Sequence, residues 1–95
     1  MLLLPDTLTA REARDTLRML SQGLRAEGND AVVIDARALT RFDSSALAVL
    51  IECHRLAKAW GRAFEVAHMP PKLAELAGLY GVAELLGAAP PAAAG

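Results

Sequence analysis

A run of apolar residues at positions 46–51 follows directly on Asp43, Ser44 and Ser45. Asp and Ser are favoured at helix N-caps because their side-chain oxygens accept hydrogen bonds from the unpaired N–H groups of the first turn. The pattern therefore predicts a helix that begins here, with Asp43 as its cap and two hydroxyls at its positive end. A hydroxyl in that place can be purely structural, or it can carry a phosphate, which the helix dipole favours.

This helix is expected to run to residue 60 and to be buried. Its apolar positions recur at helical spacing on one face: Leu47, Leu50, Ile51 and Ala57. Gly61 follows Trp60, and a glycine in that place ends a helix. Cys53 is expected to be a small core residue. Trp60 is expected at the edge of the core, partly exposed.

An earlier helix is predicted over residues 10–26. Thr9 and Glu12 form a capping box, with a hydroxyl at the N-cap and a carboxylate three residues later. Apolar residues then recur at intervals of four, three and four: Ala13, Leu17, Leu20 and Leu24. The arginines of the segment fall largely off that face and are expected to be solvated: Arg11, Arg14, Arg18 and Arg25.

Two strands flank this helix. Leu2–Leu4 is predicted as a short strand that ends at Pro5. Residues 28–30 are typical of a turn, and residues 31–34 are predicted as a strand buried on both faces, as parallel strands are. Asp35 is expected to end this strand.

Residues 36–43 are predicted as a connection with two anchors in the core: Leu39 and Phe42. A third strand is expected over residues 62–67, with Phe64 and Val66 pointing inward. Because helices and strands alternate, the chain predicts an α/β fold: a small, mostly parallel sheet with helices packed on it. In such sheets the functional edge lies where strands end and helices begin, and Asp43, Ser44 and Ser45 fall there.

A short helix is predicted after Pro70 and Pro71, which suit a first helical turn. It should reach about residue 79, with one apolar face: Leu73, Leu76, Ala77 and Tyr80. Gly81 should break it. Residues 82–86 suit a short helix or a strand equally. Residues 87–95 contain only Ala, Pro and Gly and are predicted to be a disordered tail, so the folded domain should span residues 1–86.

The composition limits the classes of partner and the cellular compartment that can be expected. The chain has 95 residues and a net charge of −1, which gives no electrostatic case for binding nucleic acid or an anionic membrane surface. With Cys53 as the single cysteine, no internal disulfide can form, and a reducing compartment is expected. No signal-peptide pattern and no apolar stretch of membrane-spanning length is visible. We therefore expect a soluble, cytoplasmic protein.

The sequence shows no catalytic site. His54 would lie about 14 Å along the helix from the two serines, too far to act as their base. His68 could lie nearer, but no group that would orient it is evident. The single cysteine and the two histidines lack metal-ligand spacing, and no nucleotide-binding loop is present. We expect a protein without enzymatic activity, metal or cofactor.

The stretch VVIDARALTRFDSSALAVL resembles the central signature of STAS domains, named after sulfate transporters and anti-sigma factor antagonists. In that signature an apolar strand ends in Asp, and after a short loop Asp-Ser/Thr-Ser/Ala-Gly-Leu begins a helix. The later stretch MPPKLAELAGLYGVAELL resembles the MlaB-like STAS subunit of the Mla phospholipid-transport ABC system. The resemblance covers about residues 2–86.

The resemblance implies roles for individual residues. Anti-sigma factor antagonists are phosphorylated on the serine that corresponds to Ser45, and MlaB-like members keep a hydroxyl at the position of Ser44. This chain has Ala46 where the family usually has Gly, which places a methyl where a partner could approach closely. The usual first hairpin is reduced to Leu2–Leu4, so the sheet edge is expected to be open for pairing with another chain.

The resemblance implies a protein-interaction module. We expect an accessory subunit that binds the ATPase of an Mla-type phospholipid-transporting ABC complex and meets the inner membrane only through that complex. The expected partner surface combines the Asp43–Ser45 loop, the exposed face of helix 44–60 and the loop from His68 to Lys72. Four residues of these segments are expected to contact the partner: Ala46, Trp60, His68 and Lys72. The alternative is an anti-sigma factor antagonist whose partner is a kinase that phosphorylates Ser45. A third interpretation is a purely structural capping turn, with the function elsewhere.

Overall fold

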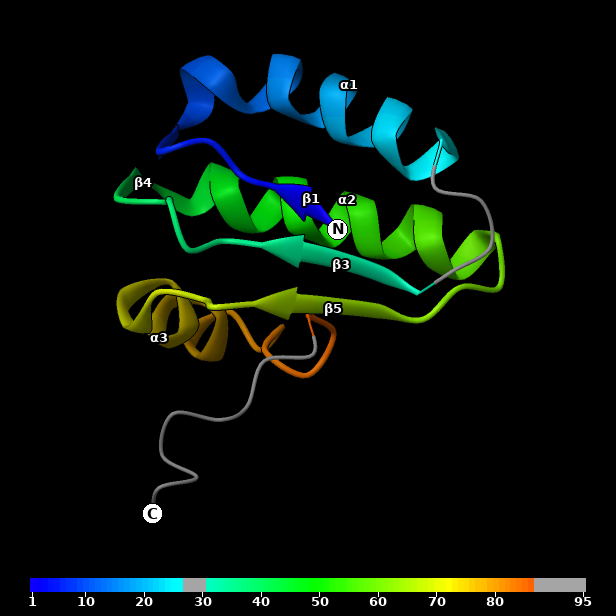
Figure 1. Ribbon diagram of the computed structural model, residues 1–95. Coiled ribbons are helices and arrows are strands. Elements are labelled where there is room, and N and C mark those ends of the chain that lie inside the picture. Colours follow the sequence, from blue (N-terminus) through cyan, green and yellow to red (C-terminus); the bar gives the residue numbers. More distant parts are fainter. Residues whose placement is uncertain (27–30, 87–95) are drawn as a thin grey trace.

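The computed structural model describes residues 1–26 and 31–86 (Figure 1). Three helices are present in these ranges: α1 (Ala10–Ala26), α2 (Ser44–Ala59) and α3 (Pro71–Leu79). Each follows the local signals of its sequence. The carboxylate of Glu12 accepts hydrogen bonds from the N–H and the hydroxyl of Thr9 at the start of α1. Helix α2 ends at Ala59, with Trp60 as its C-cap before Gly61, whose φ of 69° is left-handed. The predicted turn at 28–30 and tail at 87–95 lie outside the described residues.

Five short strands form two parallel sheets: β1 (Leu2–Leu3), β2 (Thr7–Leu8), β3 (Val32–Asp35), β4 (Arg41–Phe42) and β5 (Phe64–Ala67). The first sheet has the order β1-β3-β5, and the second pairs β2 with β4. Every pairing within the described ranges is parallel. The α/β fold with a small parallel sheet and packed helices is therefore confirmed, and β1 is an edge strand.

The core lies between the larger sheet and helices α1 and α2, which pack against each other. Val32 and Ile34 of β3 are fully buried, whereas Val33 between them is only partly buried. In Figure 1, α2 passes behind β1 and β3, and α3 lies beyond β5. The prediction that this strand is buried on both faces is therefore wrong, because α1 and α2 cover one face and the opposite face of β3 is partly open.

The connection at 36–43 contains a strand that the sequence pattern did not show. Arg41 and Phe42 form β4, which pairs with Thr7 and Leu8 of β2. The predicted strand Leu2–Leu4 ends at Leu3, although Leu4 is buried and its N–H donates to the carbonyl of Asp35. Both strands of the second sheet have two residues, too few to show an alternating pattern. The third strand starts at Phe64, two residues later than predicted.

Two predicted burial positions and one predicted element also differ in the structure. Ile51 is only partly buried, because the buried side of α2 is centred on other residues: Ala46, Leu47, Val49, Leu50, Cys53 and Ala57. Tyr80 is exposed because α3 ends at Leu79 and Tyr80 is its C-cap. Residues 82–86 form neither a helix nor a strand but a turn, in which the N–H of Leu86 donates to the carbonyls of Val82 and Ala83.

Candidate functional site

The start of α2 is organised by the carboxylate of Asp43. Asp43 is the N-cap, with an extended backbone, and its Oδ1 accepts a hydrogen bond of 2.8 Å from the N–H of Ser45. Its Oδ2 lies 3.3 Å from the nitrogen of Ala10, the first residue of α1. The hydrogen bond from Ser45 is the largest of the effects that lower the pKa of Asp43, while burial acts in the opposite direction. One carboxylate therefore joins the starts of α1 and α2.

The two serine hydroxyls differ in exposure. Ser44 is exposed, and Ser45 is partly buried in the same first turn. Because Asp43 supplies the cap, the hydroxyl of Ser44 is not needed for it. Within the described ranges this hydroxyl makes no hydrogen bond, so it can bond to a partner.

Ala46 does not belong to this surface. Its exposed fraction is 0%, and it packs in the core cluster with Leu47 and Leu50. The prediction that the methyl group of Ala46 faces a partner is therefore wrong. Ala46 is the third residue of α2, and the helix rotation that exposes Ser44 turns this position inward.

A second polar cluster lies where β3 and β5 end. Asp35 has a side chain only 1% exposed, and its Oδ2 accepts from Nε of Arg37 at 2.8 Å. Its Oδ1 accepts from the N–H of Arg37 at 2.9 Å and lies 3.2 Å from Nδ1 of His68. Burial acts to raise the pKa of Asp35, but the hydrogen bonds from Arg37 outweigh it and hold the pKa below its ordinary value.

This cluster provides the orienting group for His68 that the sequence did not reveal. Asp35 and Ala67 are in register on neighbouring parallel strands, so the residue after Ala67 comes beside the buried carboxylate. His68 has a φ of 56°, a conformation that costs energy in a residue other than glycine. The signal in the sequence was the position of an acid and a histidine at two strand ends, but the register was not known.

The cluster holds its two partners at the surface. The side chains of Arg37 and His68 are 62% and 57% exposed. Among the described residues, no hydrogen bond links His68 to Ser44 or Ser45. The imidazole is therefore oriented by a carboxylate, as in a catalytic pair, but it is not bonded to either serine hydroxyl.

The remaining predicted contact residues lie at two ends of the molecule. The strands of the larger sheet end on the same side on which α2 and α3 begin, so Ser44, His68 and Lys72 share that side (Figure 1). Lys72 is exposed in the first turn of α3. Trp60 is exposed at the other end of α2, about 24 Å from Ser44 at 1.5 Å per residue. The structure thus groups three of these residues and separates the fourth.

The described residues provide no metal-binding cluster. No group of three or more His, Cys, Asp or Glu side chains in these ranges could hold a metal ion. None of the helices there is long and apolar enough to cross a bilayer. Cys53 is fully buried, and burial raises the pKa of its thiol to about 12, so it is unreactive in the folded protein.

Comparison with known proteins identifies the family. A family model described as "Mlab, STAS domain" matches residues 2–87, which is nearly the whole chain. No curated protein matches it. The match includes the strand of Asp35, the start of α2 and the loop of His68, so it covers every part of the site described above. The chain therefore belongs to the STAS-domain family, in the group described as Mlab, and is a STAS-type interaction module.

Proposed function

We propose that this STAS domain is a non-enzymatic accessory subunit that binds the ATPase of an Mla-type phospholipid-transporting ABC complex. The Mlab description of the matching family supports this class of partner. The observation that carries the proposed binding site is the exposed hydroxyl of Ser44, which Asp43 leaves unused by capping the helix itself. In this proposal the domain is cytoplasmic and reaches the inner face of the inner membrane only through the complex.

The surface around Ser44 suits a polar protein contact. It combines a neutral hydroxyl with the exposed side chains of Arg37, His68 and Lys72 on the same side of the molecule. These groups can donate hydrogen bonds to carbonyl or carboxylate oxygens of a partner. Hydrolysis by this surface is not proposed, because within the described residues the oriented imidazole of His68 is hydrogen-bonded to Asp35 and not to either serine hydroxyl.

The alternative function is that of an anti-sigma factor antagonist controlled by a kinase. Ser45 favours this candidate, because it lies in the first turn of α2, where unpaired N–H groups and the helix dipole stabilise a phosphate. Phosphorylation would add a charge of about −1.5 to −2 to the surface. The ATPase proposal has the additional support of the Mlab description.

Charge substitutions at the start of α2 test the proposal. We expect Ser44→Asp and Ser45→Asp to keep the circular dichroism spectrum, because an acidic group is accommodated at a helix N-terminus. Binding to the co-purifying ATPase, measured by calorimetry, should weaken by about tenfold or more, which corresponds to roughly 1.4 kcal/mol. Ala63→Asp is the control, because it adds the same charge at an exposed residue just before β5, at the opposite end of the sheet from Ser44. This control should bind as the wild type does.

The same experiment separates the two candidates. Folded Asp variants that bind the ATPase as tightly as the wild type would exclude the start of α2 from the interface. Ser44→Ala should weaken binding severely if the hydroxyl contacts the partner and only mildly if it lies near it. Phosphate on Ser45, detected by mass spectrometry of the protein from native cells together with a bound serine kinase, would favour the signalling function.

A further inference from the structure

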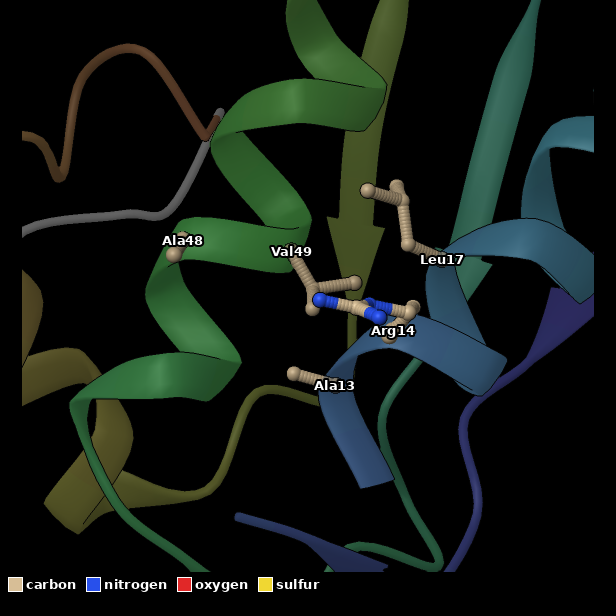
Figure 2. A pocket seen from close by; sticks show the side chains of 5 residues that line it. All are labelled: Ala13, Arg14, Leu17, Ala48 and Val49. Carbon is tan, nitrogen blue, oxygen red and sulfur yellow. The ribbon is translucent and has the colours of Figure 1, made fainter. Parts of the chain in front are cut away.

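The outer surface between α1 and α2 contains a hollow with an apolar lining. Ala13 and Leu17 line it from α1, and Ala48 and Val49 line it from α2 (Figure 2). Arg14 forms part of the rim, and Figure 2 shows its side chain reaching from α1 toward Val49. Two of the four apolar residues are alanines, whose small side chains leave the space between the helices unfilled.

The size of the hollow limits what it can hold. Its volume is about 260 Å³, below the range of about 300–1,000 Å³ typical of sites that enclose a whole small ligand. Space of this size between two helices suits one or two aliphatic side chains. Amphipathic helices dock in this way, by placing apolar residues spaced three or four apart into a groove.

The charged residues beside the hollow indicate which residues should flank the aliphatic side chain of a docked partner helix. All four arginines of α1 are exposed, and none of them forms an ion pair within the described ranges. At 100° per residue they fall within about 60° of one another, as a stripe along the edge of the groove: Arg11, Arg14, Arg18 and Arg25. The acidic residues of α1, Glu12 and Asp15, lie on the side of this stripe that is away from the groove.

Helix α2, on the other side of the groove, does not neutralise the positive charge of the arginine stripe. Glu52 lies one turn after Ala48 on α2, but Arg55 binds its carboxylate. The arginine stripe therefore remains available to acidic groups of a partner. A rim of positive charge beside an apolar hollow is complementary to a helix with an apolar centre and acidic flanks.

A membrane surface fits these observations less well. Helices that lie on bilayers insert protruding apolar side chains between the lipids. Here the apolar residues line a hollow, and the large apolar side chain that does protrude from α1, Met19, is on the opposite side of the arginine stripe from the groove. We infer that the groove between α1 and α2 receives an acidic amphipathic helix of a partner protein, with one aliphatic side chain in the hollow.

The groove begins close to the site proposed above. Ser44 and Ala48 are four residues apart on the exposed side of α2, so a protein docked at Ser44 can reach the hollow one turn away. The assignment of this acidic helix to the ATPase rests on the proposed function. The chemistry of the groove does not depend on it.

The rate at which a cysteine placed in the groove is alkylated shows directly whether a ligand occupies the groove. Ala48→Cys places an exposed thiol in the lining, while the native Cys53 stays buried with a pKa of about 12. N-ethylmaleimide should therefore modify Cys53 far more slowly than the new thiol. The probe is a synthetic helical peptide with leucines at every third or fourth position and glutamates on both flanks. A second peptide with lysines in place of the glutamates is its matched control.

We expect saturating acidic peptide to slow alkylation at position 48 by tenfold or more, and the basic peptide to have little effect. Arg14→Glu should weaken binding of the acidic peptide by tenfold or more. The same charge reversal at Lys58, an exposed residue outside the arginine stripe and about 15 Å further along α2 from Ala48, should change it by less than threefold. Equal alkylation rates with and without the acidic peptide would overturn the inference. Protection by phosphatidylglycerol vesicles but not by the peptide would also overturn it, in favour of a membrane surface.

Repeating the alkylation on the complex with the co-purifying ATPase shows whether the ATPase supplies the docked helix. Protection at position 48 in that complex would assign the helix to the ATPase. A complex that depends on Ser44 but leaves position 48 unprotected would refute that assignment and leave the proposed function intact. If the wild type does not bind the ATPase, the proposed function fails, and the peptide result still decides the groove.

Discussion

Replacing Ala46 by glycine tests whether this part of α2 faces the core or a partner. The methyl group is fully buried in the core cluster, although the usual family residue at this position would lack it. Because this methyl group packs inside the domain, Ala46→Gly removes core packing and changes nothing that a partner touches. The change should therefore appear in stability and not in binding.

The expected loss of stability has two parts. Removing one buried methyl group costs about 0.8 kcal/mol. Glycine in place of alanine inside a helix costs roughly another 0.8–1.0 kcal/mol, as an upper value for the first turn. The sum is about 1.5–2 kcal/mol, which corresponds to a fall in melting temperature of about 10 °C for a domain of this size. Ala48→Gly is the matched control, because Ala48 is exposed in the same helix and should lose only the second part.

Thermal and urea unfolding followed by circular dichroism measure the stability of both variants, and calorimetry measures the affinity of Ala46→Gly for the ATPase. Ala46→Gly should unfold more readily than Ala48→Gly by up to about 0.8 kcal/mol and should bind the ATPase with wild-type affinity. Equal unfolding midpoints for the two variants would refute the packing argument. A folded Ala46→Gly protein whose affinity for the ATPase changes tenfold would show that Ala46 belongs to the partner surface.

Two further predictions concern the polar groups. The folded-state pKa values of Asp35 and Asp43 are lowered, so the stability from these carboxylates is complete above their ordinary pKa values and is lost as the pH falls through the lower folded-state values. The urea midpoint should therefore fall below about pH 4, and it should fall less in Asp43→Asn; a midpoint independent of pH down to about pH 2 would contradict this. His68→Gly should be more stable than His68→Ala by about 1 kcal/mol, because both lose the contact with Asp35 but only glycine avoids the cost of the left-handed φ. Equal urea midpoints for these two variants would show that the backbone at this position is not strained.

The helices were predictable because their signals are local. The capping box and the apolar spacing predicted residues 10–26, and the structure has α1 over the same residues. The cap at the start of α2 follows from the chemistry of Asp43 and its neighbours in the same way. A helix end is set by a few adjacent residues, so a pattern within one turn is enough to place it.

The features that the sequence did not predict depend on contacts between segments that are distant in the chain. Strands β2 and β4 are visible only once residues 7–8 and 41–42 are known to pair. The contact between Asp35 and His68 arises from the register of β3 with β5, which no local pattern contains. The burial of Ala46 depends on how α2 rotates against the sheet. The groove between α1 and α2 depends on the packing of two helices, which no pattern within either helix describes.

The parallel pairing of the N-terminal segment also dictates the order in which the chain can fold during synthesis. Leu2 pairs with Ile34 and Thr7 with Arg41, and the first N–H of α1 meets the carboxylate of Asp43. The partner residues in β3, in β4 and at the start of α2 leave the ribosome only after α1 has been made. The apolar face of α1 therefore stays unpacked until α2 emerges. Contacts of such sequence separation slow folding and leave apolar surface open to aggregation in the meantime. The nascent domain is therefore most vulnerable between the release of α1 and the release of α2.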